Sequence, residues 1–185
     1  MLTPAKTYVE KGYQPLPAGE GFMPKEMYQQ ANRKWVKACV DVVLYFKPDD
    51  GSPHKMAIAK RKIQPMMDWW FYGGKLFVTD ESYQAGLVRK LKEEIGLEID
   101  IWRISEEPLR LHMYKWAPDN SVVSAPCFHL EITPAEYQQM RVNLAQSPEY
   151  SDLDALELQL IAQEQGFHEA LRDCAKSLRE YLLDR

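Results

Sequence analysis

The stretch that decides the fold runs from residue 73 to residue 97 and reads GGKLFVTDESYQAGLVRKLKEEIGL. Behind its two glycines and a short loop, apolar residues recur at helical spacing between Ser82 and Gly96. Ser82 can cap the start of this helix with its hydroxyl group, and Gly96 can end it in a left-handed conformation. The apolar positions are Ala85, Val88, Leu91 and Ile95. The stretch therefore predicts a glycine turn followed by a helix with one buried face.

The polar side of this helix carries two cations beside two carboxylates. Arg89 precedes Glu93 by four residues, and Lys90 precedes Glu94 by the same spacing, so each pair can meet on the helix surface. One interpretation is an ion-paired face open to solvent, which is what most such runs are. The other is a binding site, and the residues before the helix favour it.

Those preceding residues can supply further oxygen ligands. The pair Gly73-Gly74 can expose a backbone carbonyl and admit a phosphate or a metal, because no Cβ stands in the way. Glu81 comes directly before the helix. With Glu93 and Glu94 these groups would form an oxygen-rich pocket of the kind that Mg²⁺ prefers.

The rest of the chain predicts an α/β fold with a mixed sheet, an irregular N-terminal arm and a helical C-terminus. Residues 1–24 are rich in proline and glycine and form the arm, while residues 25–185 form a single domain. Thr133 and Glu136 have the capping-box pattern, so a helix is expected from Pro134. Strands are predicted at 35–47, 54–62, 69–72, 97–104, 109–116 and 122–132, the first two forming a hairpin and the last two joined by a turn at 118–120. Further helices are predicted at 25–34, 151–165 and 167–183.

Composition limits the class of protein. A chain of 185 residues with 45% hydrophobic and 27% charged residues has the balance of a soluble globular domain. The formal net charge of −4 argues against electrostatic capture of nucleic acid or of an anionic membrane. No apolar run has the length of a membrane span, and the first residues do not form a signal peptide, so a cytoplasmic location is expected. Cys39, Cys127 and Cys174 are scattered and expected to be reduced.

In its specific residues the stretch resembles the box of the Nudix hydrolase family, which is G-x5-E-x7-R-E-U-x-E-E-x-G-U with U a bulky aliphatic residue. The residues that match in register are Glu81, Arg89, Leu91, Glu93, Glu94, Gly96 and Leu97. The resemblance covers about residues 35 to 155 and implies the Nudix α/β/α sandwich. Two departures are visible: the glycines stand one residue early, or the loop before Glu81 is one residue longer, and Lys90 replaces the first glutamate of the R-E-U-x-E-E core.

Within the family, the sequence is most similar to the GDP-mannose mannosyl hydrolases, a branch that also replaces that glutamate. The resemblance implies Mg²⁺, or Mn²⁺, on Glu94 with Glu93 nearby and a carbonyl of Gly73 or Gly74. Arg89 would orient Glu81 or Glu93. This branch attacks the sugar carbon and uses a histidine of a late loop as base. The corresponding stretch here, residues 145–154, has no histidine and offers Glu149, Tyr150 and Asp152 instead.

Substrate contacts are predicted at three further positions. Arg61, in a basic triplet, could meet substrate phosphates, although such triplets are usually only solvated. Trp70 could stack on a base or a sugar, although core packing is the commoner fate of such a ring. Lys90 could either pair with Glu94 and oppose metal binding, or reach the substrate diphosphate; the i,i+4 geometry favours the pair.

The sequence therefore predicts a Mg²⁺-dependent Nudix hydrolase acting on a small molecule linked through a nucleoside diphosphate, such as the nucleotide sugar GDP-mannose. The alternative is a Nudix-fold module that binds such a nucleotide with turnover weakened or lost. Neither nucleic acid nor membrane is expected as a partner, and the resemblance is compatible with a homodimer that the N-terminal arm could bridge.

Overall fold

The computed structural model describes residues 26–27, 36–63, 67–77, 79–116, 121–144, 147 and 149–185. The predicted arm at 1–24 and the turn at 118–120 lie outside these residues, as does nearly all of the predicted helix at 25–34.

Within these residues the chain forms a seven-stranded mixed sheet in the order β3-β2-β1-β6-β5, with β4 paired to β1 and β7 paired to β2. Only the β1–β6 pair among these ladders is parallel, and the predicted β1–β2 hairpin is confirmed, with Leu44 opposite Ala57. The strands are β1 (Val36–Phe46), β2 (Lys55–Arg61), β3 (Trp69–Trp70), β4 (Tyr72–Lys75), β5 (Arg110–Trp116), β6 (Ser121–Glu131) and β7 (Tyr150–Glu157).

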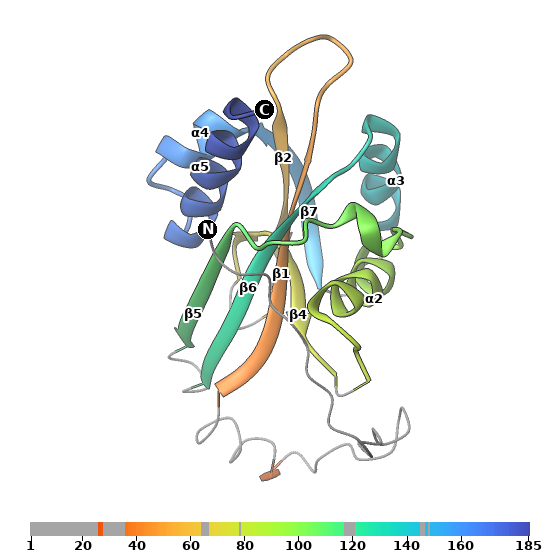
Figure 1. Ribbon diagram of the computed structural model, residues 1–185, viewed down its shortest axis with the longest axis vertical. Helices are drawn as coiled ribbons and strands as arrows, with labels where there is room; N and C mark the ends of the chain where they lie inside the picture. The colour runs from red at the N-terminus through yellow and green to blue at the C-terminus, as the bar shows by residue number, and fades with distance from the viewer. Residues whose placement is uncertain are drawn as a thin grey trace.

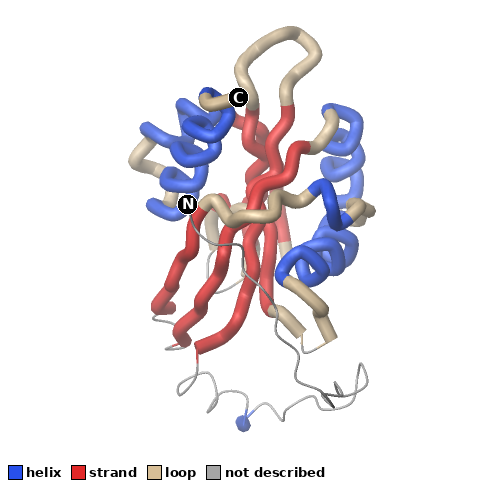
Figure 2. Tube along the Cα trace, in the orientation of Figure 1, coloured by secondary structure: helices blue, strands red, loops and turns tan. Residues whose placement is uncertain are grey.

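Helices cover both faces of the sheet, as an α/β/α sandwich requires (Figure 1). The helices α2 (Tyr83–Ile95) and α3 (Pro134–Leu144) lie on one face, whereas α4 (Leu158–Gln163) and α5 (Glu169–Leu183) lie on the other (Figure 2). Alternate residues of β1 belong to different cores: Val42 and Leu44 pack under α2 and α3, and Val43 packs under α5. This explains why β1 reads as a nearly continuous apolar run.

The predicted helix caps are present. The Ser82 hydroxyl accepts a hydrogen bond of 3.0 Å from the backbone N–H of Ala85, and Gly96 ends α2 with a φ of 62°. At α3, the backbone N–H of Glu136 donates to the Thr133 hydroxyl at 3.1 Å, while the Thr133 N–H donates to the Glu136 carboxylate at 2.7 Å. Both helices therefore begin where their local sequence specifies.

Three predicted elements are wrong. Residues 97–104 form no strand but an irregular segment and a 3-10 turn, η1 (Ile101–Arg103). Leu97 and Ile99 are buried in the core beneath α2, and this burial explains the alternation of apolar residues that resembled a strand. The helix predicted at 151–165 is a strand, β7, up to Glu157, because pairing with β2 overrides the helical preference of its alanine, leucine and glutamate residues.

The third error concerns the residues around the glycines. The single strand predicted at 69–72 is two short strands, β3 on β2 and β4 on β1, and the glycines lie within β4 and not in a turn after a strand.

Candidate functional site

The glycine pair is held against β1. In the antiparallel ladder Val40 is opposite Gly74, and Asp41 is opposite Gly73. Gly73 has a φ of +147°, and a Cβ there would overlap the carbonyl oxygen of Val40 and lie 2.7 Å from the Asp41 Cα. Only glycine fits this backbone, so the requirement at position 73 comes from close strand packing.

Gly74 makes room for a side chain of α2. A Cβ at Gly74 would lie 2.9 Å from Cε of Lys90 and 3.5 Å from its Nζ. The aliphatic part of Lys90 therefore crosses directly over β4. The ammonium group at its end lies close to the position that a side chain at Gly74 would occupy.

The buried carboxylate of the site belongs to Glu94, whose side chain is 5% exposed. The Lys90 ammonium forms an ion pair with Oε1 of Glu94, and the Tyr150 hydroxyl donates a hydrogen bond of 2.8 Å to Oε2. The predicted pairing of Lys90 with Glu94 is confirmed. Burial raises the pKa of Glu94, and the Lys90 charge and the Tyr150 hydrogen bond oppose that rise.

Arg89 contacts one of the two acids predicted from the box, Glu93, and in place of the other it binds Asp80. Its Nε and Nη2 donate to the two carboxylate oxygens of Asp80 at 2.9 and 2.7 Å, and Nη1 donates to Glu93 at 3.2 Å. Nη2 also donates to the carbonyl of Lys75 at 3.1 Å. The expected orientation of Glu93 by Arg89 is present, but Glu81 is exposed and its expected place on Arg89 is taken by Asp80.

Asp80 could have been found from the sequence. The box requires five residues between its glycine and its acid, and counting from Gly74 gives Asp80. Counting back from Arg89 gives Glu81 instead, and the extra residue in this chain lies between the acid and the helix. The Arg89 guanidinium holds the pKa of Asp80 below its usual value, against the opposing effect of burial.

The carboxylates at this site do not fit a divalent metal as they stand. Both oxygens of Glu94 have partners, one of them cationic, and Glu93 lies within ion-pair distance of Arg89 and Lys90, the latter at 3.9 Å. Across the described ranges, no three histidine, cysteine or acidic side chains gather as a group that could hold a metal ion. The metal role of Gly74, Glu93 and Glu94 stays a prediction.

The end of β2 supplies further cations near α2. Arg61 lies 3.6 Å from the carboxylate of Glu149, and the Lys62 ammonium donates to the carbonyl of Ser147 at 2.9 Å. Arg61 is opposite Tyr150 in the β2–β7 ladder, and Tyr150 bonds to Glu94, so Arg61 and its partner Glu149 lie beside the same site. Asp152, the other candidate base, is exposed on β7 opposite Lys60.

Trp70 is not brought to this site. Its ring is 5% exposed and packs in the core beneath α4 and α5, on the face of the sheet opposite α2. Ring contacts join it to Phe71 at 4.5 Å, Tyr114 at 5.6 Å and His168 at 4.9 Å between centroids. The core-packing interpretation of this tryptophan is the one that the structure supports.

A buried acid on β1 escaped the sequence reasoning. Asp41 is 7% exposed; the Tyr114 hydroxyl donates to it at 3.4 Å and lies 2.8 Å from Nδ1 of His112. Burial raises the pKa of Asp41 to about 7, although the nearby Arg61 charge and the Tyr114 hydrogen bond lower it. The signal was a lone acid inside the apolar run of β1.

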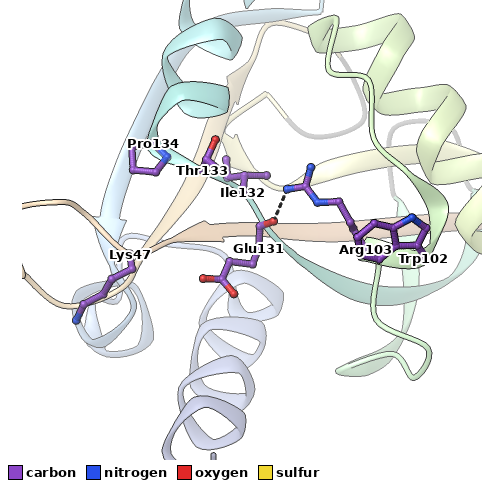
Figure 3. Close-up of a pocket in the computed structure, with 7 residues that line it drawn as sticks. All are labelled: Lys47, Trp102, Arg103, Glu131, Ile132, Thr133 and Pro134. Atoms are coloured by element: carbon purple, nitrogen blue, oxygen red, sulfur yellow. Dashed lines mark hydrogen bonds between the residues drawn. The ribbon is translucent and has the colours of Figure 1, made fainter.

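A separate hollow of about 490 Å³ lies where η1 meets the end of β6 and the start of α3 (Figure 3). Arg103 crosses it and donates to the carbonyl of Glu131 at 2.9 Å. The residues lining it are Lys47, Trp102, Arg103, Glu131, Ile132, Thr133 and Pro134, none of them a predicted site residue.

Comparison with solved structures identifies the fold. The NUDIX domain of Shewanella oneidensis NrtR, complexed with ADP ribose, matches with a TM-score of 0.58 and 21% identity over 86% of this chain and 99% of that domain. An Ap4A hydrolase from C. elegans matches with a TM-score of 0.60 and 14% identity over 81% of this chain and 100% of that one. The chain has the Nudix fold. A MutT protein from Methanosarcina mazei Go1 also matches, with a TM-score of 0.59 and 17% identity over 79% of this chain and 95% of that one.

The Nudix-fold match is structural only. No family model matches the sequence, and no curated protein sequence matches it significantly. The chain spans 62% of the longer NrtR chain that was crystallised with a 27mer DNA, which is less than two thirds of that protein. Among the described helices, none is both long and apolar enough to cross a membrane.

Proposed function

We propose that this Nudix-fold chain binds a small molecule containing a nucleoside diphosphate, such as a nucleotide sugar, at the site formed by α2, β4 and the start of β7. The fold supports this, because one structural neighbour is a NUDIX domain complexed with ADP ribose, which contains a diphosphate. The side chains support it as well: Lys90 on α2 and Arg61 at the end of β2 are cations that phosphate oxygens could approach.

The single observation that carries the proposal of binding without turnover is the ion pair between Lys90 and Glu94. In a Mg²⁺-dependent hydrolase this carboxylate would need its negative charge for the metal. In this chain the charge is already neutralised by a neighbouring side chain. The geometry therefore favours a nucleotide-binding module with weak or no turnover.

The second candidate is the Mg²⁺- or Mn²⁺-dependent Nudix hydrolase that the sequence resembles. The observation in its favour is that Arg89 holds Glu93 by an ion pair of 3.2 Å on the exposed side of α2. Position 90 lacks the glutamate that would support attack of water on the diphosphate of a nucleotide sugar. Water is therefore expected to attack the sugar carbon. Turnover in ¹⁸O-water would then place the label in the sugar, whereas label in phosphate would contradict attack at carbon.

A screen of the purified chain separates the two candidates. Nucleotide sugars and dinucleotides are tested with and without Mg²⁺, and binding, phosphate release and sugar release are followed separately. Saturable binding without release supports the binding module, and Mg²⁺-dependent release supports the hydrolase. If no nucleoside diphosphate derivative binds in either condition, the proposed function is wrong.

The remaining predictions about partners stay proposals. One neighbour was crystallised with DNA, and the net charge of −4 leads us to expect no such binding here. The homodimer and the cytoplasmic location are likewise proposed. Light scattering of the purified chain, a DNA-binding titration at low salt and cell fractionation test these three points.

A further inference from the structure

The cation position of the α2 site is filled by a side chain. The Lys90 ammonium pairs with Oε1 of Glu94 and lies 3.9 Å from Oε2 of Glu93, so it stands between the two carboxylates that the box would offer to a metal. The other oxygen of Glu94 is satisfied by the Tyr150 hydroxyl at 2.8 Å. Each oxygen of Glu94 therefore already has a partner, and the partner of Oε1 is a cation that would repel a metal ion.

This arrangement is fixed by packing. The side chain of Lys90 is 16% exposed and that of Glu94 is 5% exposed. The lysine stem lies over Gly74, where a Cβ would come within 2.9 Å of Cε. A charged pair that is largely removed from water interacts more strongly than an exposed one, and breaking it leaves an unpaired buried charge. A metal would have to displace this ammonium and then bind next to it.

We propose that Lys90 is a tethered cation that replaces the divalent metal of this site, so that the chain binds diphosphate-containing ligands without metal. The inference rests on the proposed function for its ligand class. An ammonium group has three N–H donors, and its ion pairs with Glu94 and Glu93 leave it able to contact a phosphate oxygen as well. Arg61 supplies a second cation at the same end of the sheet.

The test compares ligand binding in EDTA and in millimolar Mg²⁺. GDP-mannose and ADP-ribose are titrated calorimetrically into the wild-type chain. For each ligand, the affinity in EDTA and the affinity in Mg²⁺ should agree within about twofold. In Lys90→Met, which keeps the apolar stem, binding in EDTA should weaken by about tenfold or more. A wild-type affinity that rises tenfold or more with Mg²⁺ would overturn the inference.

A titration with Mg²⁺ alone keeps the inference testable even if neither nucleotide binds. The wild-type chain should give no binding heat and no rise in melting temperature at millimolar Mg²⁺, whereas Lys90→Glu should give both. Mg²⁺ binding by the wild-type chain contradicts the tethered cation, and so does a Lys90→Glu chain that folds but ignores Mg²⁺. Failure of both nucleotides to bind would instead count against the proposed function.

Lys92→Glu is the matched control. It makes the same change of charge on the same helix, but Lys92 is 65% exposed and pairs with Glu98 outside the site. Its nucleotide and Mg²⁺ titrations should match those of the wild-type chain. A Lys92→Glu chain that gains Mg²⁺ binding would show that the overall charge, and not the place of Lys90, controls the metal.

Discussion

Arg89 holds Asp80 through two hydrogen bonds, of 2.9 and 2.7 Å, and so ties the loop after β4 to the middle of α2. The same carboxylate accepts a hydrogen bond of 2.7 Å from the backbone N–H of Phe77, whose ring lies 3.9 Å from the guanidinium carbon. Asp80 thus links the backbone of its own loop, at Phe77, to Arg89 of α2. Glu81, one residue later, is exposed.

This relationship predicts unequal effects of two neighbouring acids on stability. Asp80→Ala should lower the free energy of unfolding by about 2 kcal/mol, because hydrogen bonds to charged groups are lost and Arg89 is left without its main partner. Glu81→Ala should change it by less than about 0.5 kcal/mol. Urea unfolding of both variants measures the difference. Equal losses would contradict the assignment of Asp80 as the partner of Arg89.

The two glycines of β4 should differ in their tolerance of alanine. Gly73→Ala should prevent folding, because the added Cβ meets backbone atoms of β1 at a φ of +147°. Gly74→Ala should still fold with a loss of about 1 kcal/mol, because its Cβ meets only the flexible end of Lys90. Circular dichroism and urea unfolding test this. If both variants fold equally well, the close approach of β4 to β1 is wrong.

The stability of the fold should depend on the ionisation of Asp41. Its pKa is about 7 in the folded chain, above the ordinary value of 3.8, so the folded state binds the proton more tightly than the unfolded state. Stability should therefore fall as the pH rises from about 4 to about 7, by up to about 1.4 kcal/mol per pH unit. Asp41→Asn removes this group and serves as the control. The difference in unfolding free energy between wild type and Asp41→Asn should change over this range, and a constant difference would contradict the shift.

Two buried tyrosines should respond in opposite ways to the loss of a hydroxyl group. Tyr150→Phe should cost about 1.5 kcal/mol, since Glu94 loses the hydrogen bond to Oε2. Tyr72→Phe should be neutral or stabilising, because its buried hydroxyl has no hydrogen-bond partner among the described residues. Thermal unfolding of the two variants at one pH gives the comparison. A larger loss for Tyr72→Phe than for Tyr150→Phe would contradict these placements.

Local signals in the sequence were sufficient for the features that depend on neighbouring residues. The start of α2 at Ser82, its end at Gly96 and the capping box at Thr133 need only contacts within a few residues, and all three are present. The ion pair of Lys90 with Glu94 belongs to the same class, because four residues bring the two side chains together on one turn of helix.

Long-range pairing explains the errors. The segment 150–157 has residues that favour a helix, but the exposed edge of β2 supplies backbone partners from Lys55 to Arg61 and makes it a strand. For Trp70 the sequence favoured core packing over a ligand contact, and the packing of α4 and α5 on its face of the sheet places it in the core.

The helix of the box, its caps and the order of charges along it follow from residue spacing and local backbone chemistry, so they are predictable from the amino-acid order alone. Three contacts become visible only once the chain is folded: Asp80 on Arg89, Tyr150 of β7 on Glu94, and Lys90 over Gly74. The residues in these contacts are not spaced by a helix or strand repeat, so their order in the sequence does not show that they meet. The contacts exist because sheet pairing joins β4 to β1 and β7 to β2, and α2 packs against β1 and β4.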